Sequence, residues 1–208
     1  MKTISIQLFS FNELSVEAQK KAIEKHYDIN VHHGWWEFLY DDFKEQATNE
    51  GFDIDRIYFS GFWSQGDGAM FEYSGLDDKL LHDFVDTLDL SPMRKQWILN
   101  NIYVSGSGKQ RGHYYHNKSC DHSIYWEINN GDLHWTTNFY QWLESFCDDF
   151  EEFVINRYDD LCHSLYTSLE NEYNYLTSEE AIKETIILNE YEFTSEGKDN
   201  ISVYNLGA

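Results

Sequence analysis

Basic residues are scarce in this chain of 208 residues, which has 15 lysines and arginines against 37 aspartates and glutamates and a formal charge of -22. A protein that binds a nucleic-acid backbone needs a basic face, and anionic membranes attract basic segments. The composition therefore argues against direct nucleic-acid binding and against binding to a membrane surface. It favours a soluble protein, and it would suit a basic partner such as a nucleic-acid-binding protein.

Cysteine and long apolar runs are scarce as well. The three cysteines, Cys120, Cys147 and Cys162, are odd in number and form no metal-type pair, which is typical of a reducing cytoplasm. No stretch reaches the length of a membrane span, and the N-terminal segment MKTISIQLFSF lacks the apolar run of a signal peptide. We therefore expect a cytoplasmic protein.

Proline is almost absent, since Pro92 is the only one, and no Gly/Ser-rich or Pro-rich linker divides the chain. Hydrophobic residues make up 41% of the chain and aromatic residues 17%. A disordered acidic chain would be poor in aromatic residues, and 208 residues suffice for one large core. We expect one folded domain over residues 1–208, without internal repeats.

Helical patterns occur in the N-terminal part and dominate the C-terminal third. Ser15 is a candidate N-cap for a helix that runs to about Asn30, and Gly51 suits the C-terminal cap of a helix over 35–49. Apolar residues recur at mostly three- and four-residue steps from Phe139 to Leu165. Further helices are expected at 76–88, from Ser91 and Pro92, and after a candidate capping box of Thr177 and Glu180.

Patterns typical of β-strands lie between these helical segments. They are expected at 3–9, on both sides of the turn at 64–68, and within 101–136, where GHYYHN and LHWTT are included and NNGD is a hairpin turn. Helices and strands thus come in blocks, which favours an α+β fold. We expect a mainly antiparallel sheet with helices packed on one face, and a long C-terminal helical region.

The first candidate site is the turn in the segment Tyr58–Ala69, YFSGFWSQGDGA. Gly66 and Gly68 on either side of Asp67 allow backbone angles that other residues avoid and let a ligand approach the main chain. Trp63 beside them offers a ring for stacking, and Gln65 lies between. The alternative is a plain hairpin turn next to an aromatic core strand, since a phosphate-binding loop would contain a lysine and begin a helix.

The same segment resembles one found in uncharacterised proteins encoded by bacteriophages and prophages. Those proteins also have a helix like ELSVEAQKKA, here Glu13–Ala22, followed by a segment like WWEFLYDDFK, here Trp35–Lys44. The resemblance covers about residues 11–73. It implies a phage setting, the cytoplasm of a host bacterium and an accessory role that counters host defences, but it assigns no activity and no catalytic residue.

The second candidate site is the aromatic and histidine-rich segment that follows. Tyr115, His116, His122 and Trp126 combine ring stacking with hydrogen bonding, as nucleotide-like ligands require. Lys109 and Arg111 precede them and could meet a phosphate. The alternatives are an aromatic core and a metal site. A metal site would have to use His113, His116, Cys120 and His122, with His134 across the turn. The spacing of these residues is not a standard zinc spacing, so we predict no metal.

The third candidate is an acidic helix. Its candidate interaction residues are Asp148, Asp149, Glu151, Glu152, Asp159 and Asp160, and the only base among them is Arg157. Such acids usually form a solvated helix face. A row of carboxylates can also stand in for the phosphates of a DNA duplex and occupy a basic groove of a host protein.

These observations lead to one functional hypothesis with two alternatives. We expect a protein that binds and sequesters a small nucleotide-like ligand through the loop and the aromatic strands, with no cofactor. The alternatives are an acidic, DNA-mimic-like inhibitor of a basic host protein and a hydrolase of a nucleotide signal. Catalysis has little support, because G-x-S-x-G, HEXXH and EF-hand patterns are absent. A homo-oligomer is left open.

Overall fold

The computed structural model describes residues 6–32, 34–129 and 136–199. The chain divides into two compact units, one formed by residues 38–169 and the other by residues 1–37 together with 170–208. The expectation of a single domain over residues 1–208 stays a prediction.

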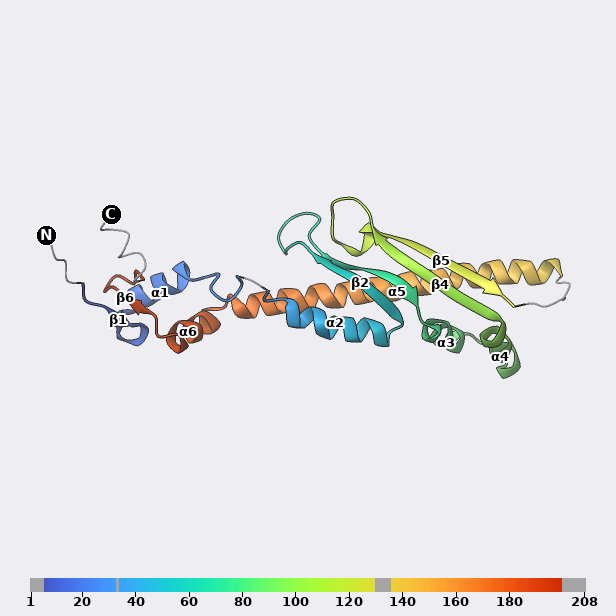
Figure 1. Ribbon diagram of the computed structural model, residues 1–208, viewed down its shortest axis with the longest axis horizontal. Coiled ribbons are helices and arrows are strands. Elements are labelled where there is room, and N and C mark those ends of the chain that lie inside the picture. Colours follow the sequence, from blue (N-terminus) through green and yellow to red (C-terminus); the bar gives the residue numbers. More distant parts are fainter. Residues whose placement is uncertain (1–5, 33, 130–135, 200–208) are drawn as a thin grey trace. The chain divides into compact units, whose positions relative to one another are not determined.

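The larger unit contains a four-stranded antiparallel sheet in the order β2-β3-β4-β5 (Figure 1). Its strands are β2 (Phe52–Phe59), β3 (Ala69–Leu76), β4 (Ile102–Gln110) and β5 (Cys120–Ile128). β4 and β5 pair without interruption from Ile102 opposite Ile128 to Gln110 opposite Cys120. The connections 60–68 and 111–119 therefore leave the sheet at the same end, where Figure 1 shows the two loops next to each other.

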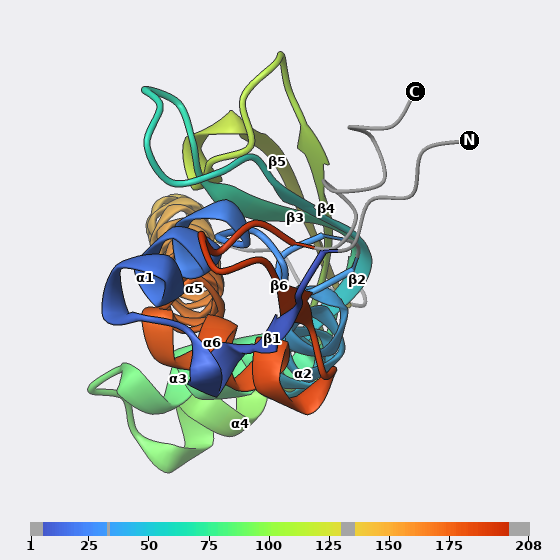
Figure 2. The same cartoon turned by 90° about the vertical axis from the view of Figure 1, so that its left-hand side faces the viewer.

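Helices cover one face of this sheet (Figure 2). They are α2 (Glu37–Asn49), α3 (Asp78–Thr87), α4 (Pro92–Asn101) and the 40-residue α5 (Thr137–Leu176). Buried residues of α5 such as Phe146, Phe150 and Val154 follow the helical repeat. Tyr158 of α5 is fully buried and donates a hydrogen bond of 2.8 Å to the carbonyl oxygen of Phe71 in β3. The predicted α+β class, with helices on one face and a long C-terminal helix, is confirmed.

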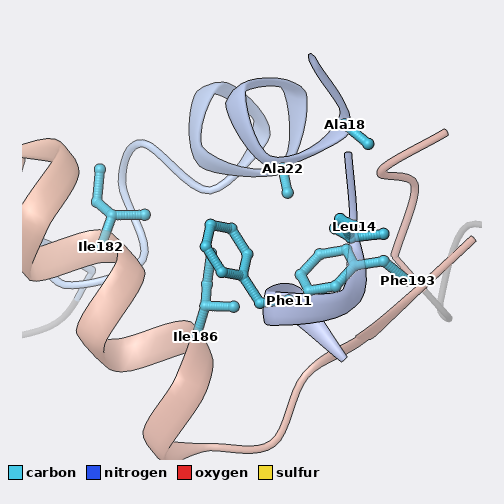
Figure 3. Close-up of a cluster of buried hydrophobic side chains, with 7 residues drawn as sticks. All are labelled: Phe11, Leu14, Ala18, Ala22, Ile182, Ile186 and Phe193. Atoms are coloured by element: carbon cyan, nitrogen blue, oxygen red, sulfur yellow. The ribbon is translucent and has the colours of Figure 1, made fainter. Parts of the chain in front are cut away.

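The smaller unit joins the two ends of the described chain. β1 (Phe9–Ser10) pairs with β6 (Glu192–Phe193), and the unit also contains the short 3-10 helix η1 (Phe11–Glu13), α1 (Val16–Lys25) and α6 (Glu179–Leu188). Figure 3 shows its core, which comes from both ends of the sequence. The core consists of Phe11, Leu14, Ala18, Ala22, Ile182, Ile186 and Phe193.

Several predicted boundaries are confirmed and others are wrong. Ser15 is the N-cap of α1, because its side chain accepts the Ala18 N–H at 3.2 Å. The helix ends at Lys25 rather than near Asn30, since the ring of His26 bonds the carbonyl of Ala22 at 2.8 Å and closes the last turn. Gly51 has the expected positive φ of 98° after α2.

The predicted capping box at the start of α6 is wrong. Ser178, not Thr177, is the N-cap, and its hydroxyl accepts the Ala181 N–H at 3.3 Å. The Thr177 hydroxyl donates to the carbonyl of Tyr173 instead, at 2.8 Å, and so belongs to the end of α5.

The segment GHYYHN at 112–117 is not a strand. It forms the β4–β5 connection, which ends in the short helix η2 (Asn117–Ser119). Most of LHWTT, the NNGD turn after its first residue and the start of the predicted strand at 3–9 lie outside the described residues. Within the described ranges, no helix is both long and apolar enough to cross a membrane.

Candidate ligand-binding sites

The β2–β3 loop is held in shape by Asp67. One oxygen of its carboxylate, Oδ2, accepts the backbone N–H of Trp63 at 2.9 Å and that of Ser64 at 2.6 Å. Gly66 takes a φ of 96°, which an L side chain rarely adopts. Trp63 lies on the outside of the turn with 73% of its surface exposed. Asp67 therefore has a structural task in this loop whether or not a ligand is present.

The two glycines of the loop make room for the neighbouring β4–β5 connection. A Cβ on Gly66 would lie 2.4 Å from the ring of Tyr114, and one on Gly68 would lie 2.8 Å from the Cβ of His116. Nearby, Tyr115 stacks on Tyr58 with ring centroids 5.1 Å apart. Close packing against Tyr114 and His116 thus explains why glycine is needed at both positions. The role of the two glycines in the approach of a ligand stays a prediction.

Three of the predicted ligand residues line one cavity of about 180 Å³, called here the loop cavity. They are Asp67, Gly68 and His116. α5 forms one wall of the cavity, and the remaining lining residues are Ala69, Asn117, Asp159, Cys162, His163 and Tyr166. Asp159, expected on the acidic surface, is half-buried here. Sequence reasoning missed the contribution of α5 because cavity walls depend on tertiary packing.

Lys109 and Arg111, predicted to meet a phosphate, do not line the loop cavity. Lys109 Nζ donates to Asp55 Oδ2 at 2.6 Å, and this hydrogen bond raises the pKa of Lys109 and lowers the pKa of Asp55. Arg111 Nη1 lies 3.3 Å from Asp121 Oδ1. Both cations already have a carboxylate partner. The described residues that line the loop cavity include two carboxylates and neither lysine nor arginine. The loop cavity is therefore a poor place for a phosphate.

His122 and Trp126 also lie outside the loop cavity. His122 Nδ1 is hydrogen bonded to the hydroxyl of Tyr73 at 3.0 Å, and its ring meets that of Tyr158 edge-on at 4.7 Å. Burial lowers the pKa of His122, although Asp159 and Asp121 act in the opposite direction, so the ring is neutral at pH 7. Trp126, on the same face of β5 by alternation, is 41% exposed.

The structure thus does not gather the predicted ligand residues into one cavity. Whether those outside it bind a ligand stays a prediction. In the part of the chain that is described, no three histidine, cysteine, aspartate or glutamate side chains converge as a metal site would require. Burial raises the pKa of Cys120 to about 11, so its thiol stays protonated. His134 lies outside the described residues.

The acidic face of α5 is where the sequence placed it. Asp148, Asp149, Glu151, Glu152 and Asp160 are exposed, while Phe146 and Phe150 face the core. Arg157 turns away from these acids, and its Nε lies 3.1 Å from Glu50 Oε2, without the angle of a hydrogen bond.

A larger cavity, of about 470 Å³, lies elsewhere in the same unit and was missed by sequence reasoning. This tryptophan cavity is lined by Leu90, Arg94, Trp97, Ile98, Phe139 and Trp142. α4 supplies Arg94 and Trp97 three residues apart, so both lie on one side of the helix. The start of α5 supplies Phe139 and Trp142 at the same spacing.

Aromatic rings and one cation define the chemistry of the tryptophan cavity. The ring centroids of Trp97 and Phe139 lie 5.7 Å apart, and those of Phe139 and Trp142 lie 5.5 Å apart. Trp142 is 37% exposed, and Arg94 is exposed as well. Among the described residues, Arg94 has no ion pair, in contrast to Lys109 and Arg111. The signal in the sequence was the spacing Arg-x-x-Trp after the helix start at Pro92.

Fold and cavities together define an α+β protein with two candidate ligand sites, one between the loops at the end of the sheet and α5 and one between α4 and the start of α5. A family model described as "Domain of unknown function (DUF8835)" matches residues 35–179, more than half of the chain, and the chain belongs to this family. The matched region contains both cavities. No curated protein and no solved structure matches the chain.

Proposed function

We propose that this protein binds and sequesters a small nucleotide-like ligand, and that the ligand occupies the tryptophan cavity. The observation that carries the proposal is Arg94 beside Trp97 and Trp142, with no ion pair to any carboxylate in the described part of the chain. Stacking of a base on an aromatic side chain contributes about 1–3 kcal/mol per base, and a guanidinium binds a phosphate through paired hydrogen bonds. A planar ring that bears a phosphate meets both requirements.

Size and charge support this assignment. The cavity volume of about 470 Å³ lies within the range of about 300–1,000 Å³ that is usual for small-molecule sites. The chain has a formal charge of -22, so an anion is repelled from most of its surface. Arg94 provides a local exception, because no carboxylate within the described ranges is paired with it.

The proposed site differs from the one that the sequence suggested. The loop cavity is smaller, at about 180 Å³, and its described lining includes Asp67 and Asp159 but neither lysine nor arginine. The predicted cations Lys109 and Arg111 are held by Asp55 and Asp121. We therefore keep the function that the sequence suggested, and we propose a different binding site for it, between α4 and the start of α5.

The biological setting that we propose is that of a phage-type accessory protein, which would act against a host defence in the bacterial cytoplasm. This part of the proposal rests on the resemblance of residues 11–73 to phage and prophage proteins. Removal of a nucleotide signal from solution needs binding alone, so sequestration requires no catalytic group.

The test is to incubate the purified full chain with a mixture of nucleotides and to analyse the protein-bound and free fractions by mass spectrometry. We expect an intact ligand in the bound fraction. A chemically changed ligand would instead support the hydrolase. Arg94→Gln should weaken binding about tenfold or more, because a charged hydrogen bond contributes about 1.5–3 kcal/mol. Arg56→Gln, at an exposed arginine of β2, is the matched control and should have no effect.

A second candidate function is inhibition of a basic host protein through the acidic face of α5. It is favoured by the exposure of Asp148, Glu151, Glu152 and Asp160 on one helix. Charge reversal at Asp148, Glu151 and Glu152 should abolish activity if this function is correct, and binding should weaken with salt, since exposed charges are screened within about 10 Å at 0.1 M. Ligand binding in the tryptophan cavity should survive the same change.

A further inference from the structure

A second, smaller compartment adjoins the tryptophan cavity. It has a volume of about 180 Å³ and shares Leu90 and Trp142 with the larger cavity as common wall residues. Its remaining lining residues are Phe84, Leu88, Asp89, Ser145, Phe146 and Asp149. Trp142 therefore has the cation Arg94 in the cavity on one side and two carboxylates, Asp89 and Asp149, in the compartment on the other.

The polar groups of the smaller compartment are presented in part by one rigid element. Trp142, Ser145 and Asp149 follow each other at steps of three and four residues in α5, so they lie on one face of that helix. Asp89 comes from the connection between α3 and α4. An ionised carboxylate accepts hydrogen bonds and cannot donate them, so this end of the site favours groups that donate hydrogen bonds and repels phosphate.

We infer that the two compartments together select a guanine nucleotide with a single phosphate. This inference rests on the proposed function. The phosphate is directed to Arg94, because Asp89 and Asp149 repel it from the opposite end. The base lies against Trp142, and one of its edges faces Asp149.

Guanine is the base whose edge fits a carboxylate. Its ring N1–H and its 2-amino group are adjacent donors, and they match the two oxygens of one carboxylate in a paired arrangement. Adenine offers its 6-amino donor next to the N1 acceptor, which a carboxylate repels. Among the described residues, Arg94 is the only cation that lines the tryptophan cavity, and the chain has a charge of -22. Both facts favour one phosphate over several.

The test is a set of titrations followed by tryptophan fluorescence, with GMP, AMP, IMP and guanosine as probes. We expect GMP to bind about tenfold or more tightly than AMP, because a good bidentate pair contributes discrimination of about this size or larger. IMP keeps the N1–H but lacks the 2-amino group and should fall between them. Guanosine lacks the phosphate and should bind more weakly than GMP.

Two variants test whether Asp149 is the residue that selects guanine over adenine. Asp149→Asn should reduce the preference for GMP over AMP to less than about threefold, because the new amide donor is repelled by the donors of guanine and fits the N1 acceptor of adenine. The affinity for GMP should fall and that for AMP should rise. Asp148→Asn, at the exposed neighbouring residue, should keep the preference. Tight binding of GMP and AMP with equal affinity would overturn the inference and leave the proposed function standing. Failure of every nucleotide to bind would overturn both.

Discussion

The loop cavity and the tryptophan cavity lie in the same unit. They differ in how many of the nearby charged and aromatic side chains already have partners within the protein. Around the loop cavity, Asp67 holds the turn, Tyr114 packs over Gly66, and Lys109 is paired with Asp55. At the tryptophan cavity, Arg94 lies beside Trp142 with no ion pair among the described residues. Residues that form a conspicuous sequence motif can thus contact one another in the fold, while side chains that are available to a ligand lie elsewhere.

The largest stability effect should come from filling the space at Gly66. Gly66→Ala adds a Cβ 2.4 Å from the Tyr114 ring at a φ of 96°. We expect a loss of about 2–3 kcal/mol in the free energy of unfolding, from backbone strain and overpacking together. Chemical denaturation measures it.

Gly112→Ala is the matched control for this change. Gly112 also has a positive φ, of 81°, but a Cβ there would meet nothing within 4 Å. We expect a loss of only about 1 kcal/mol, from the backbone alone. Equal losses at the two positions would show that Tyr114 does not pack on Gly66 as described, and the contrast between the two cavities would weaken.

A smaller effect is expected from His122 as the pH falls. Burial lowers the pKa of His122 in the folded protein, so the unfolded chain takes up a proton at a higher pH than the folded chain does. The free energy of unfolding should therefore decrease as the pH falls below the unfolded value of about 6.5. In His122→Gln the decrease between pH 7 and pH 5.5 should be shallower than in the parent.

His82→Gln, at an exposed histidine of α3, is the control for this measurement. Its pH dependence should match that of the parent. An unchanged slope in His122→Gln would mean that burial does not lower the pKa of His122, so this side of the sheet would be more open to water than the structure indicates.

The smallest effect on ligand affinity is expected from changes at Lys109 and Arg111, the two cations that the sequence suggested as phosphate ligands. Lys109→Gln and Arg111→Gln should leave nucleotide affinity unchanged, because both side chains pair with exposed carboxylates outside either cavity. Isothermal titration calorimetry checks this directly. A tenfold loss of affinity in either variant would return the ligand site to the β4–β5 connection.

Much of the fold was predictable because it follows from local patterns. Apolar residues at steps of three and four in α5 predicted a long helix, and the glycine-rich turn between two aromatic segments predicted the pairing of β2 with β3. Helix ends were less predictable. Thr177 and Ser178 are both good caps, and only the bond from Thr177 to Tyr173 decides between them.

The candidate site was predictable only in part, because a cavity is made by packing between distant segments. His116 and Asp67 line the loop cavity together, and Asp159 joins them from α5. Arg94 and Trp142 are 48 positions apart in the sequence, and no motif links them. Their proximity depends on how α4 and the start of α5 pack, and the sequence does not encode that as a pattern.

The most direct test of the account compares two tryptophans in one assay. Trp142→Leu and Trp63→Leu each remove a ring, one from the tryptophan cavity and one from the exposed β2–β3 loop. The nucleotide recovered from the bound fraction is titrated against both variants and the parent by calorimetry. The account predicts a loss of affinity of about tenfold or more for Trp142→Leu and none for Trp63→Leu. The reverse result, with Trp63 required and Trp142 dispensable, would contradict it.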